Sequence, residues 1–292
     1  MEEVKTPAGE RSATTSAGIS SQSQTGWAGR SARTNVPDKH YGWLSSLRSY
    51  LFFDPLIWAY TVFLGILAIP VSLFGDKERI LHRFARVWAQ LIMKTVFSPV
   101  KVIGLDKIDT SKTHVYAVNH ASALDIPVLY VELPFQFRIV FKKELLSYPV
   151  VGWHLRRSGQ VCIDQQTPSR SIAAIRSAVK SLQAGMPLVI FPEGGRTPDG
   201  EIRPFLPGAF YLAIKAQVDI VPIALVGTYE LLPMNTYHIK SRPLEMRVGE
   251  PISTAGYKLR EMETLSAKVQ TAMEELYYQA PNSTKLHTPF PG

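Results

Sequence analysis

A stretch of 19 residues without a charged side chain, 56–74, constrains the fold of this chain more than any other feature of its sequence. Its length is close to the roughly 20 apolar residues that a helix needs to cross about 30 Å of hydrocarbon. Gly65 and Pro70 interrupt the stretch, so a bent or re-entrant hairpin is an alternative to a full span, and a buried helix of a soluble protein is a third. The length and the absence of charge favour contact with a membrane over a buried helix.

The charges on either side of this stretch predict its orientation. Lys77, Arg79, Arg83 and Arg86 follow it, whereas the segment 41–55 before it contains Arg48 as its one basic residue. Because Lys and Arg collect on the cytoplasmic side of membrane segments, this asymmetry predicts that the bulk of the chain lies on the cytoplasmic side of a membrane.

Residues 83–97 carry apolar side chains at helical spacing on one face and polar or cationic side chains on the other. A helix of this kind either covers a sheet or, directly after a membrane segment, lies in the lipid interface, and the sequence supports both. We therefore predict a membrane-associated helical region over residues 41–97. Its apolar face consists of Phe84, Val87, Trp88, Leu91, Ile92 and Val96, and its polar face of Arg83, Arg86, Gln90 and Lys94.

The two ends of the chain are predicted to lie outside the folded part. Residues 1–40 are rich in Ser, Thr and Gly, a composition that buries too little apolar surface to offset the loss of chain entropy. We predict a disordered tail there and a flexible C-terminal tail over residues 281–292. The first segment has no central apolar stretch, so it is not predicted to be a secretory signal.

The charge balance and the cysteine content restrict the class of partner and of site. The chain has 32 Lys and Arg against 24 Asp and Glu, a net charge of +8, which indicates an anionic partner such as phosphate, nucleic acid or an acidic membrane surface. Nucleic-acid binding is disfavoured because the sequence has no RNP signature and no basic-aromatic module. The single cysteine, Cys162, excludes an internal disulfide framework and a multi-cysteine zinc site.

From residue 98 to 280, short apolar runs rich in β-formers alternate with helical patterns, which predicts an α/β domain with a largely buried sheet. Pro222 lies within one of these runs and indicates a sheet edge or a strand start, because proline has no N–H to give to the ladder. The expected strands are residues 114–119, 137–141, 160–164, 188–194, 220–227 and 244–249, and the expected helices are residues 169–184, 208–217 and 265–279.

The first expected strand, 114–119, runs into a histidine and an aspartate five residues apart. Five residues turn a straight helix by about 500°, so His120 and Asp125 cannot meet on one continuous helix, but they can meet if the histidine lies in the turn and the aspartate in the first helical turn. In that arrangement the carboxylate accepts the imidazole N–H and fixes its tautomer, and His120 serves as a general base for a hydroxyl proton. Ser122 and Asp125 also fit a helix capping box, so a purely structural role is the alternative.

A second cluster, residues 191–197, directly follows an apolar run. Gly194 and Gly195 allow the backbone to approach a ligand closely, and Arg196 offers a planar fork of donors that suits a phosphate. A tight surface turn with an exposed arginine is the alternative. The sequence has no P-loop, no dinucleotide fingerprint and no G-x-S-x-G elbow, which disfavours a nucleotide-dependent enzyme and a serine hydrolase.

Four blocks of sequence resemble, in their order and spacing, the 1-acyl-sn-glycerol-3-phosphate acyltransferase family, also called the lysophosphatidic acid acyltransferases. The resemblance covers roughly residues 100–249. It implies an α/β fold, with a glycerolipid acyltransferase-like sheet flanked by helices and preceded by N-terminal membrane-associated helices. The blocks are Asn-His-x-x-x-x-Asp at 119–125, Lys-Lys-Glu-Leu-x-x-x-Pro-x-x-Gly-Trp at 142–153, Phe-Pro-Glu-Gly-x-Arg at 191–196 and Val-Pro-Ile at 221–223.

The resemblance also implies an activity and its participants. A fatty acyl group would pass from acyl-CoA or acyl carrier protein to the sn-2 hydroxyl of lysophosphatidic acid, giving phosphatidic acid in phospholipid biosynthesis. No metal, cofactor or covalent intermediate is implied. The partners would be a lysophospholipid acceptor, the acyl donor and membrane lipids, with no nucleic acid.

Individual residues receive roles from the same resemblance. His120 would deprotonate the acceptor hydroxyl, and Asp125 would orient the histidine. Arg196 would hold the acceptor phosphate, with Lys142 assisting, although a pair of lysines such as Lys142 and Lys143 commonly forms a solvated face. The implied acceptor site consists of Glu193, Gly194, Gly195, Arg196 and Lys142.

Several positions depart from the family pattern. Gly195 stands where threonine is usual and Thr197 where serine is common, Gln165 replaces a frequent arginine, and the loop before Gly208 lacks a frequent lysine. These departures concern the acceptor headgroup, so acylation of another lysolipid is the alternative enzymatic hypothesis. A catalytically silent membrane-binding protein with a basic surface is the alternative outside the enzymes.

Overall fold

Seven strands form one sheet in the computed structural model, which describes residues 43–164 and 168–279. The strand order is β1-β7-β6-β2-β5-β3-β4, and neighbouring strands are parallel except for the antiparallel pair β6 and β7. The predicted tails, 1–40 and 281–292, and Gln165 lie outside the described residues. The strands are β1 (Val100–Ile103), β2 (Val115–Val118), β3 (Arg138–Lys142), β4 (Val161–Ile163), β5 (Leu188–Ile190), β6 (Ile220–Val226) and β7 (Leu244–Val248).

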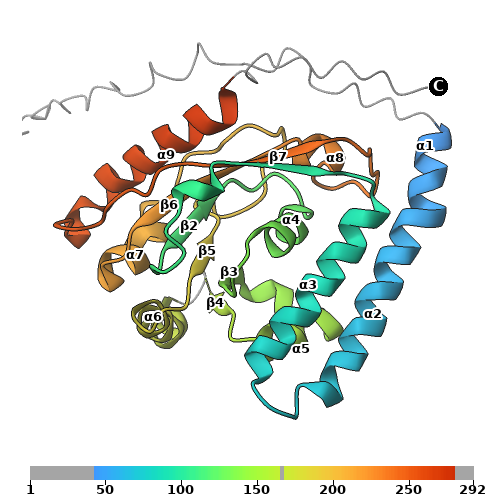
Figure 1. Cartoon of the computed structure of the whole chain (residues 1–292), viewed down its shortest axis with the longest axis horizontal. Helices are drawn as coiled ribbons and strands as arrows, with labels where there is room; N and C mark the ends of the chain where they lie inside the picture. The colour runs from blue at the N-terminus through green and yellow to red at the C-terminus, as the bar shows by residue number, and fades with distance from the viewer. Residues whose placement is uncertain (1–42, 165–167, 280–292) are drawn as a thin grey trace, which may run out of the picture. The chain divides into compact units, whose positions relative to one another are not determined.

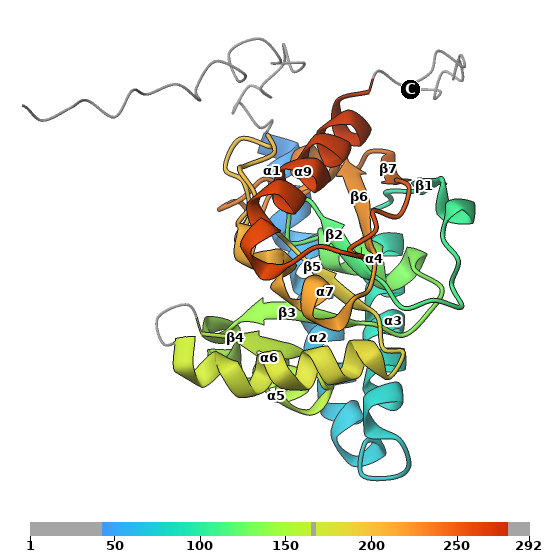
Figure 2. The same ribbon diagram turned by 90° about the vertical axis from the view of Figure 1, so that its left-hand side faces the viewer.

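Helices cover both faces of this sheet, which confirms the predicted α/β fold (Figures 1 and 2). On one face α3 and α4 pack against the strands, and α2 and α5 lie beyond them; on the other face lie α6, α7 and α9. The helices are α1 (Trp43–Arg48), α2 (Asp54–Val71), α3 (Lys77–Thr95), α4 (Asp125–Glu132), α5 (Pro149–Arg157), α6 (Pro168–Gln183), α7 (Tyr211–Ala216), α8 (Thr228–Leu231) and α9 (Met262–Tyr278).

Short turns of other helix types connect these elements. A π-helical turn, η1, joins α1 to α2, and the remaining four are 3₁₀ turns. These turns are η1 (Ser49–Phe53), η2 (Leu105–Lys107), η3 (Lys143–Ser147), η4 (Pro207–Phe210) and η5 (Leu259–Glu261).

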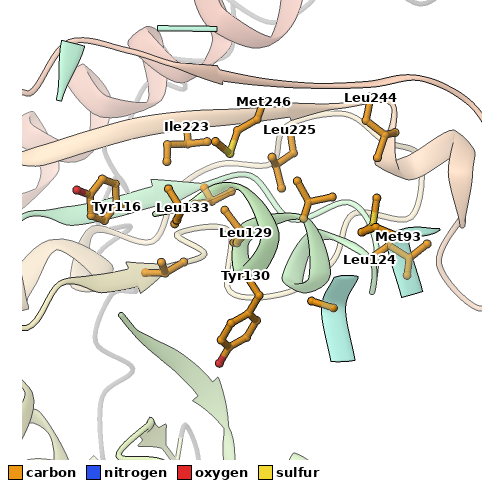
Figure 3. Close-up of a cluster of buried hydrophobic side chains, with 14 of the residues drawn as sticks. Met93, Tyr116, Leu124, Leu129, Tyr130, Leu133, Ile223, Leu225, Leu244 and Met246 are labelled. Atoms are coloured by element: carbon orange, nitrogen blue, oxygen red, sulfur yellow. The ribbon is translucent and has the colours of Figure 1, made fainter. Parts of the chain in front are cut away.

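The core between the sheet and α4 explains why the central strands are continuous apolar runs. Side chains on both faces of β2 and β6 are buried, as expected for interior strands covered by helices on both sides. Figure 3 shows Leu129 of α4 and Leu133, the residue directly after this helix, lying toward Ile223 and Leu225 of β6, with Tyr130 pointing the other way. This packing fixes the position of α4, and therefore of Asp125 at its first residue.

The residues of α2 that face away from the rest of the protein are large and apolar. The helical segment Ser46–Val71 has 26 residues and is long and apolar enough to cross a membrane, yet only 11% of its most apolar window is buried. A core helix of a soluble protein would be mostly buried, so this exposure disfavours that alternative. The exposed side chains of α2 include Trp58, Val62, Phe63, Ile66, Leu67, Ile69 and Val71.

Gly65 and Pro70 do not break this stretch as the sequence suggested. The helix α2 is continuous, and Pro70 lies in its last turn. A Cβ atom at Gly65 would overlap the side chain of Val150 in α5, so the glycine permits a close approach of two helices rather than a bend. The chain reverses only after α2, at residues 72–76, so that α2 and α3 lie side by side (Figure 1).

The helix α3 covers the α/β domain, which decides between the two alternatives for its apolar stripe. Its buried residues Ala85, Ala89 and Ile92 belong to the main core. Ile92 is part of the predicted stripe, whereas Ala85 and Ala89 each lie one position after a residue of that stripe. The indole N–H of Trp88 donates to the Thr61 hydroxyl of α2 at 2.9 Å, so a second face of α3 contacts α2. Arg86, predicted on a solvated face, instead donates to the carbonyl oxygens at the end of α4.

The prediction that Pro222 marks a sheet edge or a strand start is wrong, because β6 is central and Pro222 is its third residue. The pairing of β6 with its neighbour explains why proline is tolerated. Ile220 opposes Ile252, whereas Ile223 opposes Val248, so one extra residue is inserted on the neighbouring chain beside Pro222. Such a bulge interrupts the ladder where proline lacks its N–H.

Two elements differ from the sequence expectation near the edges of the domain. Strand β1 was not predicted, because it has only four residues and alternates between half-buried and exposed positions at the sheet edge. The helix expected over residues 208–217 begins as the 3₁₀ turn η4 and continues as α7, which ends at Ala216. The next residue, Gln217, caps the helix with a left-handed backbone.

Candidate active site

Two loops that follow neighbouring parallel strands meet at one edge of the sheet. Strand β2 ends at Val118 and β5 ends at Ile190, and carboxyl ends of adjacent parallel strands emerge on the same side. His120 lies in the first loop and Phe191 opens the second. The backbone N–H of Thr197 donates to the carbonyl of His120 at 2.9 Å. The two clusters singled out in the sequence, about 70 residues apart, therefore form a single site.

His120 and Asp125 form the pair that their spacing predicted. The His120 Nδ1 atom lies 2.9 Å from Asp125 Oδ2, with the histidine in the loop and the aspartate at the first residue of α4. The Asp125 side chain is 0% exposed, and 18% of the His120 side chain is exposed. A carboxylate oxygen at this position requires the proton on Nδ1, which leaves the Nε2 lone pair free to accept a proton.

The same carboxylate also shapes the loop. Asp125 Oδ2 accepts the backbone N–H groups of Ala121 and Ser122 at 2.8 and 2.9 Å. The bond from the Ser122 N–H is one half of the capping box that the sequence allowed, while the Ser122 hydroxyl donates to the carbonyl of Leu232 and accepts the N–H of Leu124 rather than that of Asp125. Asp125 thus closes the turn that carries His120 and orients the imidazole at the same time.

Two neighbours of His120 were not predicted from the sequence. The ring of Phe191 stacks on the imidazole with centroids 4.1 Å apart and 24° between the ring planes. The buried side-chain amide of Asn119 donates to the carbonyl of Leu225 and accepts its N–H, at 3.1 and 2.7 Å, and so fastens the end of β2 to β6. Both contacts restrict where the imidazole can lie. The position of Phe191 and Asn119 directly after strands was the available signal.

The Glu193 side chain connects the His120 loop to the later part of its own loop, at Arg203. Its Oε1 atom accepts the backbone N–H of His120 at 2.8 Å, and its Oε2 atom accepts the backbone N–H of Arg203 at 2.9 Å. Burial raises the pKa of this carboxyl to about 7, although both backbone donors act in the opposite direction. Both oxygens are therefore engaged within the protein, whereas the predicted role was a contact with the acceptor.

The glycine pair and Arg196 form the outer part of the second loop. Gly194 has a φ of +72°, a left-handed conformation that favours glycine. Arg196 is exposed and makes no hydrogen bond or ion pair with any residue of 43–164 or 168–279. The backbone N–H of Thr197 bonds to the His120 carbonyl, so the backbone of the preceding residue, Arg196, lies next to the histidine loop. An exposed guanidinium on a loop that bonds to the His120 loop suits an anionic group on a substrate.

Lys142 and Lys143 occupy different environments. A Cβ atom on Gly195 would lie 3.6 Å from the Lys142 Nζ atom, so the ammonium of Lys142 lies against the glycine loop. Lys143 instead pairs with Asp164 at 3.1 Å. The structure therefore brings Lys142 to the site with its charge available, while the charge of Lys143 is compensated by a carboxylate.

The loop beyond Arg196 is held by its own hydrogen bonds. The Thr197 hydroxyl, which is buried, donates to Asp199 at 2.6 Å, and Asp199 pairs with the Arg203 guanidinium at 2.6 Å. The phenol of Tyr278 in α9 accepts the N–H of Ile202 at 3.2 Å. Sequence reasoning missed Arg203, whose contacts depend on how this loop folds back on itself.

Comparisons with known proteins find similar sequences and a similar fold. The sequence model of the acyltransferase family matches residues 99–226. A chloroplastic 1-acyl-sn-glycerol-3-phosphate acyltransferase of Arabidopsis thaliana is 33% identical over 196 residues, which is 65% of this chain and 54% of the relative. The bovine 1-acyl-sn-glycerol-3-phosphate acyltransferase alpha is 28% identical over 233 residues, covering 79% and 81%. The chain spans about half the length of the chloroplastic Arabidopsis relative.

A solved structure has the same fold. The crystal structure of the 1-acyl-sn-glycerophosphate acyltransferase PlsC from Thermotoga maritima matches with a TM-score of 0.67 at 24% identity, over 80% of this chain and 95% of that one. The seven-stranded sheet flanked by helices is therefore an acyltransferase fold. Residues 99–226 therefore match the acyltransferase family model, and the chain is similar to 1-acyl-sn-glycerol-3-phosphate acyltransferases in sequence and fold.

Proposed function

We propose that this protein transfers a fatty acyl group from acyl-CoA or acyl carrier protein to the sn-2 hydroxyl of lysophosphatidic acid, giving phosphatidic acid for phospholipid biosynthesis. The observation that carries the proposal is the oriented imidazole: His120 Nδ1 lies 2.9 Å from the buried Asp125 carboxylate, while Nε2 is left for a substrate. Relatives named as 1-acyl-sn-glycerol-3-phosphate acyltransferases support the choice of acceptor.

The reaction needs a base at one atom and no metal or cofactor in this proposal. His120 Nε2 takes the proton of the acceptor hydroxyl as the oxygen bonds to the carbonyl carbon of the thioester. The carbon–sulfur bond then breaks, and the proton passes from Nε2 to the leaving thiolate. Asp125 holds the imidazole in the required tautomer and stabilises the positive charge that it acquires. A positioned base of this kind contributes typically about 10²- to 10⁴-fold in rate.

The acceptor phosphate finds two cations beside this base. Arg196 is exposed, free of intramolecular pairing among the described residues, and one residue from the hydrogen bond to the His120 loop. Lys142 lies against Gly195 in the same loop. A planar guanidinium binds a phosphate through two parallel hydrogen bonds, and a neighbouring ammonium adds charge.

Arg196→Ala is expected to raise the acceptor KM by about 10- to 100-fold, because hydrogen bonds to charged groups contribute about 1.5–3 kcal/mol. Initial rates are measured against the concentration of lysophosphatidic acid at saturating acyl donor, and then against the concentration of acyl donor at saturating lysophosphatidic acid. Arg176→Ala is the matched control, since Arg176 is an exposed arginine on α6 on the other face of the sheet. An effect on the acyl-donor KM alone would assign Arg196 to the donor instead.

Membrane attachment through the helices α2 and α3 completes the proposal. The exposed face of α2 is apolar, and α3 carries exposed charged residues, Arg83 and Lys94 among them, along the side of α2. If α2 crossed the bilayer as it is packed here, those charges would enter hydrocarbon, which is costly. We therefore propose that α2 lies in one leaflet and that the catalytic domain is on the cytoplasmic side, where the basic residues after α2 face anionic lipid.

One assay separates the proposed activity from its alternatives. Membrane fractions or purified protein are supplied with labelled acyl-CoA or labelled acyl carrier protein, together with lysophosphatidic acid or lysolipids with other headgroups. Label in phosphatidic acid supports the proposal, and the preferred donor identifies the carrier. Gln165 replaces a frequent arginine, and the loop before Gly208 lacks a frequent lysine. These two departures from the family pattern favour lysolipids with other headgroups as the second candidate acceptors. Failure to consume any donor would leave the membrane-binding hypothesis.

A further inference from the structure

The carboxylate of Glu193 joins the two loops that make up the site. One oxygen accepts the N–H of His120 at 2.8 Å, and the other accepts the N–H of Arg203 at 2.9 Å. The Arg203 side chain in turn pairs with Asp199, which accepts the Thr197 hydroxyl. The backbone of the proposed base and the loop that carries Arg196 are thus connected through a single side chain.

An ionised carboxylate suits this position because it presents acceptors only. When a carboxyl is protonated, one of its oxygens carries a hydrogen and has less capacity to accept. The part-buried N–H of His120 or that of Arg203 would then face a weaker acceptor. Loss of a charge-assisted hydrogen bond weakens this link, so the two segments would rearrange.

The surroundings of Glu193 place its titration in the range where the enzyme would operate. Burial raises its pKa to about 7, and the negative charge of Asp125 in α4 acts in the same direction. The backbone N–H groups of Arg203 and His120 and the positive charge of Arg203 lower the pKa, without outweighing burial. Arg196 follows Glu193 by three residues in the same loop, and His120 contributes the backbone N–H that bonds to it.

We propose that Glu193 is a positioning residue, whose carboxylate holds the His120 loop and the Arg203 loop in register, and whose protonation loosens the site and lowers turnover. This inference rests on the proposed acyl transfer and assigns Glu193 a role other than contact with the acceptor. The charge on Glu193 thereby becomes a second requirement for turnover, separate from the neutral state of His120.

The test compares kcat of the wild type and of Glu193→Gln across pH. The amide has one acceptor oxygen, so it mimics the protonated carboxyl at every pH. We expect the ratio of wild-type to variant kcat to be about tenfold near pH 8 and to approach one below about pH 6, where the wild type has also lost the carboxylate. The variant carries no charge at this position at any pH, so a change of the ratio with pH reports the charge on Glu193.

Two further variants make the comparison specific. Glu132→Gln is the matched control, since Glu132 is a half-buried carboxyl at the far end of α4 whose pKa burial also raises. It should leave kcat and its pH profile unchanged. Glu193→Asp keeps the titratable charge on a shorter side chain, so it should lower kcat but retain a pH-dependent ratio to Glu193→Gln.

Several outcomes would overturn the inference. A ratio that does not change with pH, or a raised acceptor KM with unchanged kcat, would mean that Glu193 does not position His120 through its charge. Melting temperatures give a readout independent of activity: the raised pKa means that the wild type loses stability relative to Glu193→Gln as pH rises from about 4.5 to about 7. A constant difference would refute the titration. An inactive wild type would instead count against the proposed function.

Discussion

His120→Ala is expected to lower kcat for acyl transfer by about 10²- to 10⁴-fold, equivalent to about 3–5.5 kcal/mol of barrier. The hydroxyl of a lysolipid is a weak nucleophile, and removal of its proton must accompany formation of the carbon–oxygen bond. With Nδ1 turned to Asp125, His120 Nε2 is the proposed acceptor of that proton, and Arg196 and Lys142 belong to the adjoining glycine loop and its neighbour. The measurement is single-variant kinetics with lysophosphatidic acid and labelled acyl donor.

The loss should occur without loss of structure. The His120 side chain is partly exposed and makes its ring contacts with Asp125 and Phe191, so its removal leaves a small gap at the surface of the site. The melting temperature and the liposome-bound fraction of His120→Ala should therefore stay near wild type. Asp125→Asn should also lose activity, because it disturbs the tautomer. If His120→Ala unfolds the protein, the pair serves structure and the catalytic assignment fails.

The local parts of this site could be predicted from the sequence. The five-residue spacing of His120 and Asp125 rules out contact on one continuous helix and allows it at a strand-to-helix junction, and that steric condition holds whatever the rest of the fold does. Gly194 and Gly195, in the loop after an apolar run, similarly indicated a turn that glycine favours, and Gly194 has a left-handed backbone. Such predictions depend on a few consecutive residues and their allowed conformations.

Contacts between distant segments could not be predicted in this way. The stacking of Phe191 on His120 and the bond from the Arg203 N–H to Glu193 depend on β2 and β5 being neighbours, and on the exact path of the following loop. Many sheet orders are compatible with the same alternation of strands and helices. The role of Glu193 between the two loops therefore needed the structure.

In the fold, too, the features set by local sequence could be predicted, and those set by distant segments could not. Apolar runs identified the central strands because both of their faces are buried, whereas the edge strand β1 has an alternating pattern on four residues and escaped notice. Pro222 misled because the sequence does not show the extra residue on the chain opposite it. The stretch 56–74 was identified by its lack of charge, but which of its side chains face outward depended on the position of α3 and α5.

The outward face of α2 is the basis of the second large effect. Its inner face is held to α3 by the hydrogen bond of Thr61 with Trp88 and the contact of Tyr60 with Thr95 at 3.2 Å. The polar groups of α2 are therefore turned toward protein, and its exposed side is left to apolar side chains. An exposed apolar surface of this extent is typical of a membrane contact.

Replacing Phe63 and Ile66 together by aspartate is expected to reduce the membrane partition coefficient by at least about 10²-fold. The two side chains are 67% and 57% exposed and lie three residues apart on α2, so both would enter the lipid. Each large apolar side chain contributes about 1.5–3 kcal/mol when fully buried, and two carboxylates add the cost of leaving water. Cosedimentation with liposomes of anionic and neutral lipid measures the effect.

The matched control carries the same change of charge elsewhere. Ile172 and Ala173 are exposed on α6, on the other face of the sheet, so Ile172→Asp with Ala173→Asp should leave partition near wild type. The Phe63 and Ile66 variant should fold normally, since neither side chain is buried, and should still acylate a detergent-dispersed acceptor while losing activity on bilayers. Unchanged partition would show that α2 is not the docking face, because no other property of this variant compensates for two carboxylates in hydrocarbon.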